Sequence, residues 1–134
     1  MKNLLVFVFS LLLLSCTDIS SVDEMDIKLI ENIPVSANTP NAFSYVIRAN
    51  DFNQQINSPL NFDTASFVAA IVIGDYSSGL LSLTIHNEDS SKTYNQVITS
   101  NMVFSDFPTF HAASLELKLE SFSGSVDLAV TVGD

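Results

Sequence analysis

The sequence predicts an all-β protein, built as a single antiparallel β-sandwich of the jelly-roll type. Apolar and polar residues alternate in several runs, which is the pattern of a strand with one buried face. No segment shows the i, i+3, i+4 spacing of an amphipathic helix. The runs are short and turn residues separate them; about seven or eight such strands in one domain are typical of a sandwich or jelly roll.

Length and composition agree with one small folded domain. The chain has 134 residues, of which 47% are hydrophobic, so it can bury a core. Its formal net charge is −10, with only 5 lysines and arginines. Binding of nucleic acid needs clustered basic side chains, so we expect no nucleic-acid partner. The same charge opposes electrostatic docking onto an anionic membrane.

The domain is predicted to begin with two strands. Residues 25–29 and 43–48 each alternate between apolar and polar side chains, as half-buried strands do. Pro34 and Pro40 bracket the residues between these strands, and this segment is predicted to be a loop. The following residues, 51–57, are rich in Asn and Gln, and they are also interpreted as a polar loop.

The middle of the chain is predicted to hold a central strand and a hairpin. Residues 67–73 are apolar on both faces, which favours a strand that is covered on both sides and ends at the turn-rich residues 74–79. Residues 81–86 and 92–99 alternate, and the turn residues Asn, Asp and Ser at 87–91 lie between them. We therefore expect these two runs to pair as a hairpin.

The strictest alternation lies near the C-terminus. Residues 115–120 place leucines on one face and charges on the other, and residues 126–132 place Val and Leu on one face. A glycine-containing segment, 122–125, separates the two runs. Two alternating runs joined in this way predict a second hairpin.

The first residues have the organisation of a secretory signal peptide. Lys2 gives a small positive n-region, and residues 4–14 form an apolar stretch broken only by Ser10. Eleven residues are too few to cross a membrane as a helix, which takes about 17–25 residues. This stretch is therefore predicted to be removed rather than to remain as an anchor.

The end of the apolar stretch, Leu13-Leu14-Ser15-Cys16, resembles the lipobox of bacterial lipoprotein precursors. The resemblance implies cleavage between Ser15 and Cys16, and diacylglycerol on the Cys16 sulfur. Two or three acyl chains on one residue anchor a protein stably, whereas one chain does so only marginally. In Gram-negative lipoproteins an aspartate directly after the cysteine favours the inner membrane. Thr17 occupies that position here, so the expected location is the outer membrane, in a leaflet that the sequence does not specify.

These features divide the chain into three parts. They are a signal peptide at residues 1–15, a lipidated cysteine and flexible tether at 16–24, and a β-sandwich domain at 25–134. The tether is small, polar and acidic, as suits a solvated spacer, although acidic residues after the cysteine also serve some lipoproteins as a surface-export signal. Both interpretations of the tether stay open.

No catalytic motif is evident. Cys16 is the only cysteine, so a disulfide or a thiolate metal cluster is excluded within one chain. His86 and His111 lack the spacing of a zinc site, and Tyr76 stands where a nucleophile elbow needs serine. We expect a non-enzyme with no metal and no cofactor. A small hydrolase is the least favoured alternative, because it would require acids or histidines that converge in a cleft.

Calcium is the ion that fits the composition best. Asp51 and Asn53 begin a run with oxygen side chains at alternate positions, but residues 56 and 62 lack the Gly and Glu of a calcium-binding EF-hand loop. Glu88 and Asp89 could act as ligands only together with partners from elsewhere in the fold. The expectation remains a domain that needs no metal.

Aromatic residues supply the candidate ligand contacts. Phe104, Phe107 and Phe110 lie in a segment that either plugs one end of the core or forms a binding platform with Tyr76. The leading hypothesis is a lipid-anchored, non-catalytic module of the cell envelope that binds a partner protein or serves as a structural component. The alternative is a carbohydrate-binding surface lipoprotein, in which these rings, or Tyr94, stack on sugars; the absence of tryptophan weakens it.

Overall fold

The computed structural model describes residues 30–133. The expected signal peptide, the lipidated Cys16, the tether and the strand at 25–29 lie outside the described residues. Every regular element within 30–133 is a β-strand. This part of the chain accordingly contains no helix that is long and apolar enough to cross a membrane.

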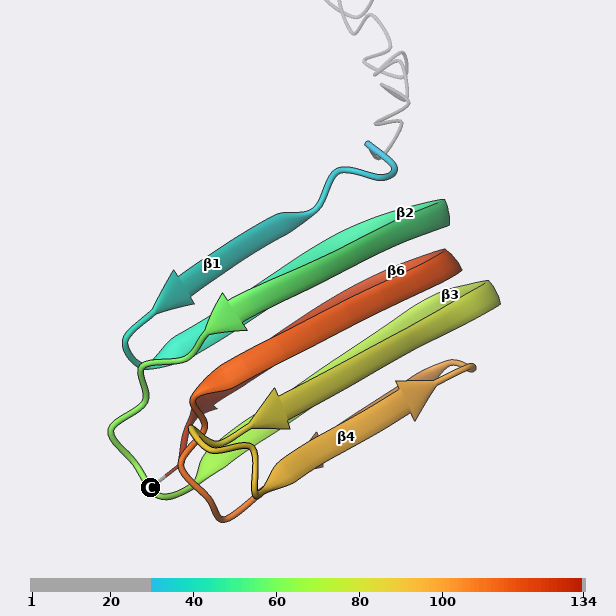
Figure 1. The fold of residues 1–134 in the computed structure, drawn as a ribbon. Helices are drawn as coiled ribbons and strands as arrows, with labels where there is room; N and C mark the ends of the chain where they lie inside the picture. Colours follow the sequence, from blue (N-terminus) through green and yellow to red (C-terminus); the bar gives the residue numbers. More distant parts are fainter. Residues whose placement is uncertain (1–29, 134) are drawn as a thin grey trace, which may run out of the picture.

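Six strands form one antiparallel sheet (Figure 1). Their order across the sheet is β1-β2-β6-β3-β4, and β5 pairs with β3. The strands, in chain order, are β1 (Val35–Thr39), β2 (Ala42–Pro59), β3 (Phe67–His86), β4 (Thr93–Ile98), β5 (Met102–Asp106) and β6 (Ser114–Val132). β2, β3 and β6 are three to four times as long as β1, because each of them runs through two layers.

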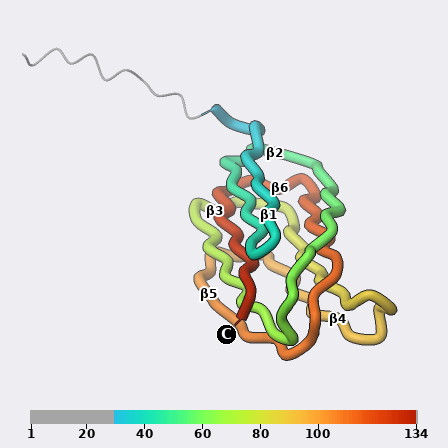
Figure 2. Tube along the Cα trace, turned by 90° about the vertical axis from the view of Figure 1, so that its left-hand side faces the viewer, coloured from blue at the N-terminus to red at the C-terminus, as the bar shows by residue number. Residues whose placement is uncertain are grey.

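The three long strands bend at irregularities in their register. β2 shifts against β6 between Ala49 and Gln54, and β3 shifts against β6 between Gly74 and Leu80. Extra residues of this kind interrupt a ladder and bend the strand. On one side of the bends β3 pairs with β5, and on the other side it pairs with β4. The sheet therefore folds over on itself into two layers (Figure 2).

The segments follow a jelly-roll order. The first layer contains β1, then residues 42–49 of β2, 124–132 of β6 and 67–74 of β3, and finally β5. The second layer contains residues 52–59 of β2, 114–122 of β6 and 80–86 of β3, and then β4. Apart from β1, each layer has four segments, and the chain crosses between the layers six times, three times within the long strands and three times in connecting segments, as in a jelly roll. The predicted all-β sandwich is confirmed.

The bends depend on unusual backbone conformations. Asp51, Asp75 and Ser121 have φ values of 47°, 51° and 44°, one in each bent strand. Side chains such as Asp tolerate this left-handed region better than most, although it remains uncommon outside glycine. Two hydrogen bonds between β2 and β6 support these turns: Asp51 N donates to Ser123 Oγ and Ser121 N to Asn53 Oδ1, each at 2.8 Å.

The core lies between the two layers. The buried side chains form one cluster to which all the strands except β1 and β5 contribute, with Met102 and Phe104 of β5 packed against it. Phe67 of the first layer meets Tyr94 of the second with ring centroids 6.0 Å apart and planes at 90°. The alternation seen in the sequence thus points one face of β2, β3, β4 and β6 inward and leaves the other in solvent, whereas β1 is exposed on both faces.

Several local predictions hold and several are wrong. The hairpin of residues 81–86 with 92–99 is confirmed, since Leu81 pairs with Ile98 and His86 with Thr93. The predicted hairpin of 115–120 with 126–132 is wrong, because these runs are two halves of β6 and pair with β2 and β3 instead. A glycine-containing segment suits a bend within a strand as well as it suits a turn.

Four other predictions are wrong, three of them because polar or small residues were taken to mark the end of a strand. The supposed loop between Pro34 and Pro40 is β1, and the supposed polar loop at 51–57 is the second half of β2. Residues 67–73 do form a central strand, but its outer face is open to solvent, with Val72 45% exposed. This strand also continues through 74–79 rather than ending there.

Candidate functional site

The predicted aromatic contacts do not come together. Phe104 packs partly buried against the core, and the Phe110 ring lies 5.1 Å from Phe67 in an edge-to-face arrangement. Phe107 is different, because 69% of it is exposed. Tyr76 lies at the bend in the middle of β3, whereas Phe67 begins this strand, and the Tyr76 hydroxyl donates to the Gly79 carbonyl at 2.8 Å.

The candidate calcium ligands are also separated. Asp51 and Asn53 lie at the bend of β2, whereas Glu88 and Asp89 lie in the turn between β3 and β4. Asn53 accepts a hydrogen bond from Ser121, and Asp89 accepts one from the Ser91 backbone at 3.0 Å. Hydrogen bonds from Ser91 lower the pKa of Asp89. Within residues 30–133 no three His, Cys, Asp or Glu side chains gather as a metal site.

Three surface grooves of the described residues lie toward one end of the sandwich. We call this the loop end, made of residues 60–66, 87–92 and 107–113, which connect the strands opposite the bends (Figure 2). One groove of about 440 Å³ is lined by Asn87, Glu88, Asp89 and His111. A second, of about 400 Å³, is lined by Ser66, Phe67, Val68, Phe107, Thr109, Val132 and Gly133. A third, of about 280 Å³, extends from the loop end onto the outer face of the second layer.

The described chain begins at the other end. Asn32 is tied to the start of the β2 bend, since its backbone N donates to the Arg48 carbonyl at 2.8 Å. Its side chain accepts from Asn50 N at 2.8 Å and donates to the Asn50 carbonyl at 3.0 Å. The described residues therefore begin at the bend end (Figure 2), and the residues that line the three grooves lie toward the opposite end.

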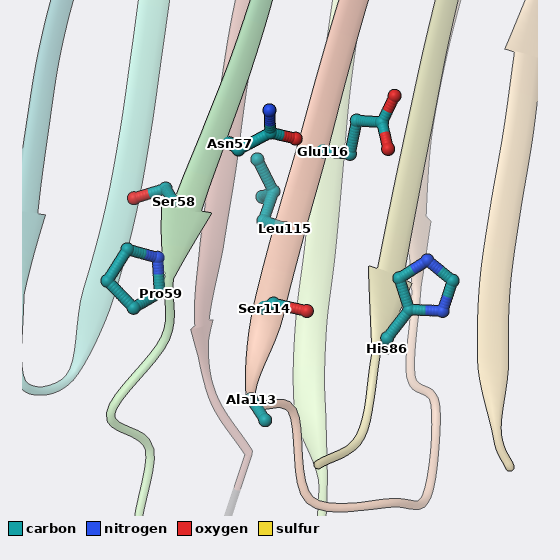
Figure 3. A pocket seen from close by; sticks show the side chains of 8 residues that line it. All are labelled: Asn57, Ser58, Pro59, His86, Ala113, Ser114, Leu115 and Glu116. Atoms are coloured by element: carbon teal, nitrogen blue, oxygen red, sulfur yellow. The ribbon is translucent and has the colours of Figure 1, made fainter. Parts of the chain in front are cut away.

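The third groove is built by β2, β3 and β6 together (Figure 3). Its lining residues are Asn57, Ser58, Pro59, His86, Ala113, Ser114, Leu115 and Glu116. The register aligns Pro59, Ser114 and His86 in one row across the three strands. Because Ser114 is small and its neighbours in the row are bulky, a hollow forms over the middle strand.

Serine, histidine and glutamate lie in this groove, but they are not arranged as a catalytic triad. His86 Nδ1 lies 3.0 Å from Thr93 Oγ1 on the neighbouring strand, and its partner there is a hydroxyl rather than a carboxylate. Glu116 accepts instead from Gln55 Nε2 at 3.0 Å. A nucleophilic serine needs a base that is within hydrogen-bond reach and is oriented by a third group. Within the described part of the chain, no hydrogen bond links Ser114 to His86 or His86 to Glu116.

The sequence did not reveal the groove, because His86 stood out there only as a histidine without the spacing of a zinc site. The main polar residues of the groove lie near positions 57, 86 and 114–116, and only the pairing of three strands unites them. The one available signal was the alternation itself, which places these side chains on the outer face of their strands.

Comparisons with known proteins add little to this picture. No protein-family model matches the chain, and no curated protein matches it either. A cupin superfamily protein from Desulfitobacterium hafniense is similar in structure, with 12% identity, 78% of this chain and 81% of that chain covered, and a TM-score of 0.36. The apo structure of BiXyn10A CBM1 has 10% identity, coverage of 74% and 69%, and a TM-score of 0.34. Likenesses this distant do not bear on what the chain binds.

Proposed function

We propose that this chain is a lipid-anchored protein of the bacterial cell envelope whose β-sandwich is a non-catalytic binding module. The anchor is Cys16, at the end of the lipobox-like segment, and the outer membrane is the proposed location. The ligand is engaged at the loop end. The observation that carries this proposal is that the two ends of the domain differ. The three grooves lie toward the end opposite to the one where the described residues begin.

Anchor and binding end are well separated in this arrangement. Thirteen residues lie between Cys16 and Ile30, and a chain of that length spans at most about 50 Å from one of these residues to the other. In this arrangement the tether joins the domain at its bend end, so the loop end is the part of the domain farthest from the point of attachment. The fold alone does not specify a ligand, because β-sandwiches host many functions. The proposal therefore depends on the position of the grooves.

Lipidation is tested by metabolic labelling of the full-length protein in a bacterial host with a fatty-acid analogue. The wild-type protein should carry the label and partition into detergent, whereas Cys16→Ser should do neither. Label that persists on Cys16→Ser would remove the anchor from the proposal.

The binding end is tested by cysteine accessibility in cells. Cys16 is the only native cysteine and is acylated in the proposed mature protein, so one engineered cysteine reports one position. Glu88→Cys lies at the loop end, and Ser105→Cys, on the exposed outer face of β5, is the matched control. Maleimide should label Glu88→Cys more slowly in intact cells than after purification in detergent. For Ser105→Cys, the ratio of the labelling rate in cells to the rate after purification should be close to one. Equal ratios at the two positions would contradict binding at the loop end.

A further inference from the structure

The outer face of the second layer is polar in its two rows nearest the loop end, while Val97 is exposed in the next row. Adjacent strands lie about 4.8 Å apart, so side chains in register form rows of closely spaced groups. Two adjacent rows across β2, β6, β3 and β4 contain Asn57, Glu116, Thr84 and Asn95, and then Pro59, Ser114, His86 and Thr93. Seven of these eight side chains carry hydrogen-bonding groups.

Neighbouring side chains hold the key groups in place. Thr93 holds one nitrogen of His86, and Gln55 holds one oxygen of Glu116. Among the described residues, His86 Nε2 and Glu116 Oε2 have no hydrogen-bond partner. Figure 3 shows His86 and Glu116 on one side of the groove and Pro59 on the other, with Ser114 between them. The groove thus offers an apolar ring on one wall and fixed polar groups on the other.

We infer that this groove binds a neutral carbohydrate, an inference that rests on the proposed function and names the ligand class for it. A sugar ring carries hydroxyls that both donate and accept, and it has an apolar C–H face. Glu116 accepts from hydroxyls, while the Asn57 amide and the Ser114 hydroxyl do both. Pro59 packs against the C–H face. Groups already fixed by their neighbours lose little entropy when they bind.

Charge determines which carbohydrates fit. Glu116 is the one charged side chain among the groove-lining residues, and the chain as a whole has a formal net charge of −10. Phosphorylated, sulfated or uronic-acid-rich ligands would meet this negative field with no Lys or Arg among the groove-lining residues, and Lys118, on the same face, is already paired with Glu120. The lining groups are side chains on a sheet face rather than an open strand edge, so an extended peptide cannot add to them as a further strand.

The test uses the full-length chain, purified in detergent, on an array of neutral gluco-, xylo-, manno- and galacto-oligosaccharides beside sulfated and uronic-acid-rich glycans. Binding should be confined to neutral glycans, and calorimetric titration of the best ligand gives its affinity. Ser114→Leu fills the groove floor and should weaken binding at least tenfold. Glu116→Gln removes the charged acceptor and should weaken it several-fold. Ser105→Leu, the same change as Ser114→Leu but on the outer face of β5, should leave affinity unchanged.

Two results would overturn the inference. If no neutral glycan binds, the ligand class is wrong, while the cysteine-accessibility result stands or falls by itself. If a neutral glycan binds with equal affinity to Ser114→Leu and wild type, but is lost in Phe107→Ala, the site is wrong and the Phe107 groove holds the ligand.

Discussion

Two buried tyrosines provide a sensitive test of the packing between the layers. Tyr94 is 9% exposed, and its hydroxyl is buried without a hydrogen-bond partner among the described residues. Gln96 and Asp106 are its polar neighbours, but neither has the geometry of a hydrogen bond to it. Tyr45 is fully buried, and its hydroxyl donates to Gln54 Oε1 at 2.7 Å. The tyrosine hydroxyl therefore lacks a hydrogen bond in Tyr94 and makes one in Tyr45.

Removing the hydroxyl should have opposite effects at the two positions. An unsatisfied buried polar group costs about 1–3 kcal/mol, so Tyr94→Phe should raise the free energy of unfolding by about 1 kcal/mol or more. A typical hydrogen bond contributes about 0.5–1.5 kcal/mol net, so Tyr45→Phe should lower it by about 1 kcal/mol. The variants should then differ by about 2 kcal/mol, although each has lost one oxygen.

Urea denaturation followed by far-UV circular dichroism measures this difference. The slopes of the transitions should match, since neither change alters the surface exposed on unfolding. In thermal melts, about 1 kcal/mol corresponds to a shift of roughly 4 °C or more for a domain of about 100 residues. If Tyr94→Phe proves as destabilising as Tyr45→Phe, the Tyr94 hydroxyl has a partner and the reasoning is refuted.

Two further predictions concern pH and the bends. Burial raises the pKa of Tyr45 to about 12, and burial together with the Asp106 charge raises that of Tyr94 to about 12. Since an unfolded tyrosine titrates near pH 10, stability should be intact below about pH 10 and fall as the pH rises toward 12, by about 1–3 kcal/mol for each tyrosine. Urea denaturation at several pH values between 10 and 12 measures this loss, and the free energy of unfolding should fall less steeply with pH in the Tyr45→Phe/Tyr94→Phe double variant than in the wild type. An equally steep fall in both proteins would show that these two tyrosines do not cause the loss of stability. Gly79 has a φ of 87°, and a Cβ there would lie 2.2 Å from the Ser121 carbonyl oxygen, so Gly79→Ala should lower stability by about 2 kcal/mol or more. Ser77→Ala, at an exposed position in the same bend, should change stability by less than about 0.5 kcal/mol, and similar losses in both would show that the bend is not tightly packed.

The sequence by itself determined which face points into the core where apolar and polar residues alternate. Leu115, Leu117 and Leu119 alternate with charged residues, and all three are 0–1% exposed. Hydrophobic alternation with a period of two is a local property, because successive side chains of a strand point to opposite faces. The all-β class and the hairpin of β3 with β4 follow from the same property, together with the turn residues between the two strands.

Tertiary structure decided where the strands end and which residues share a site. Residues 122–125 suit a turn as well as a bend, and the choice depends on whether the two halves of β6 pair with each other or with β2 and β3. That choice is made by the core between the layers, which lies far from the segment in sequence. The groove at Ser114 arises in the same way, because only the register across three strands places Pro59 and His86 on either side of it. Local pattern fixes the orientation of a side chain, whereas its neighbours across the sheet depend on pairings between segments many residues apart.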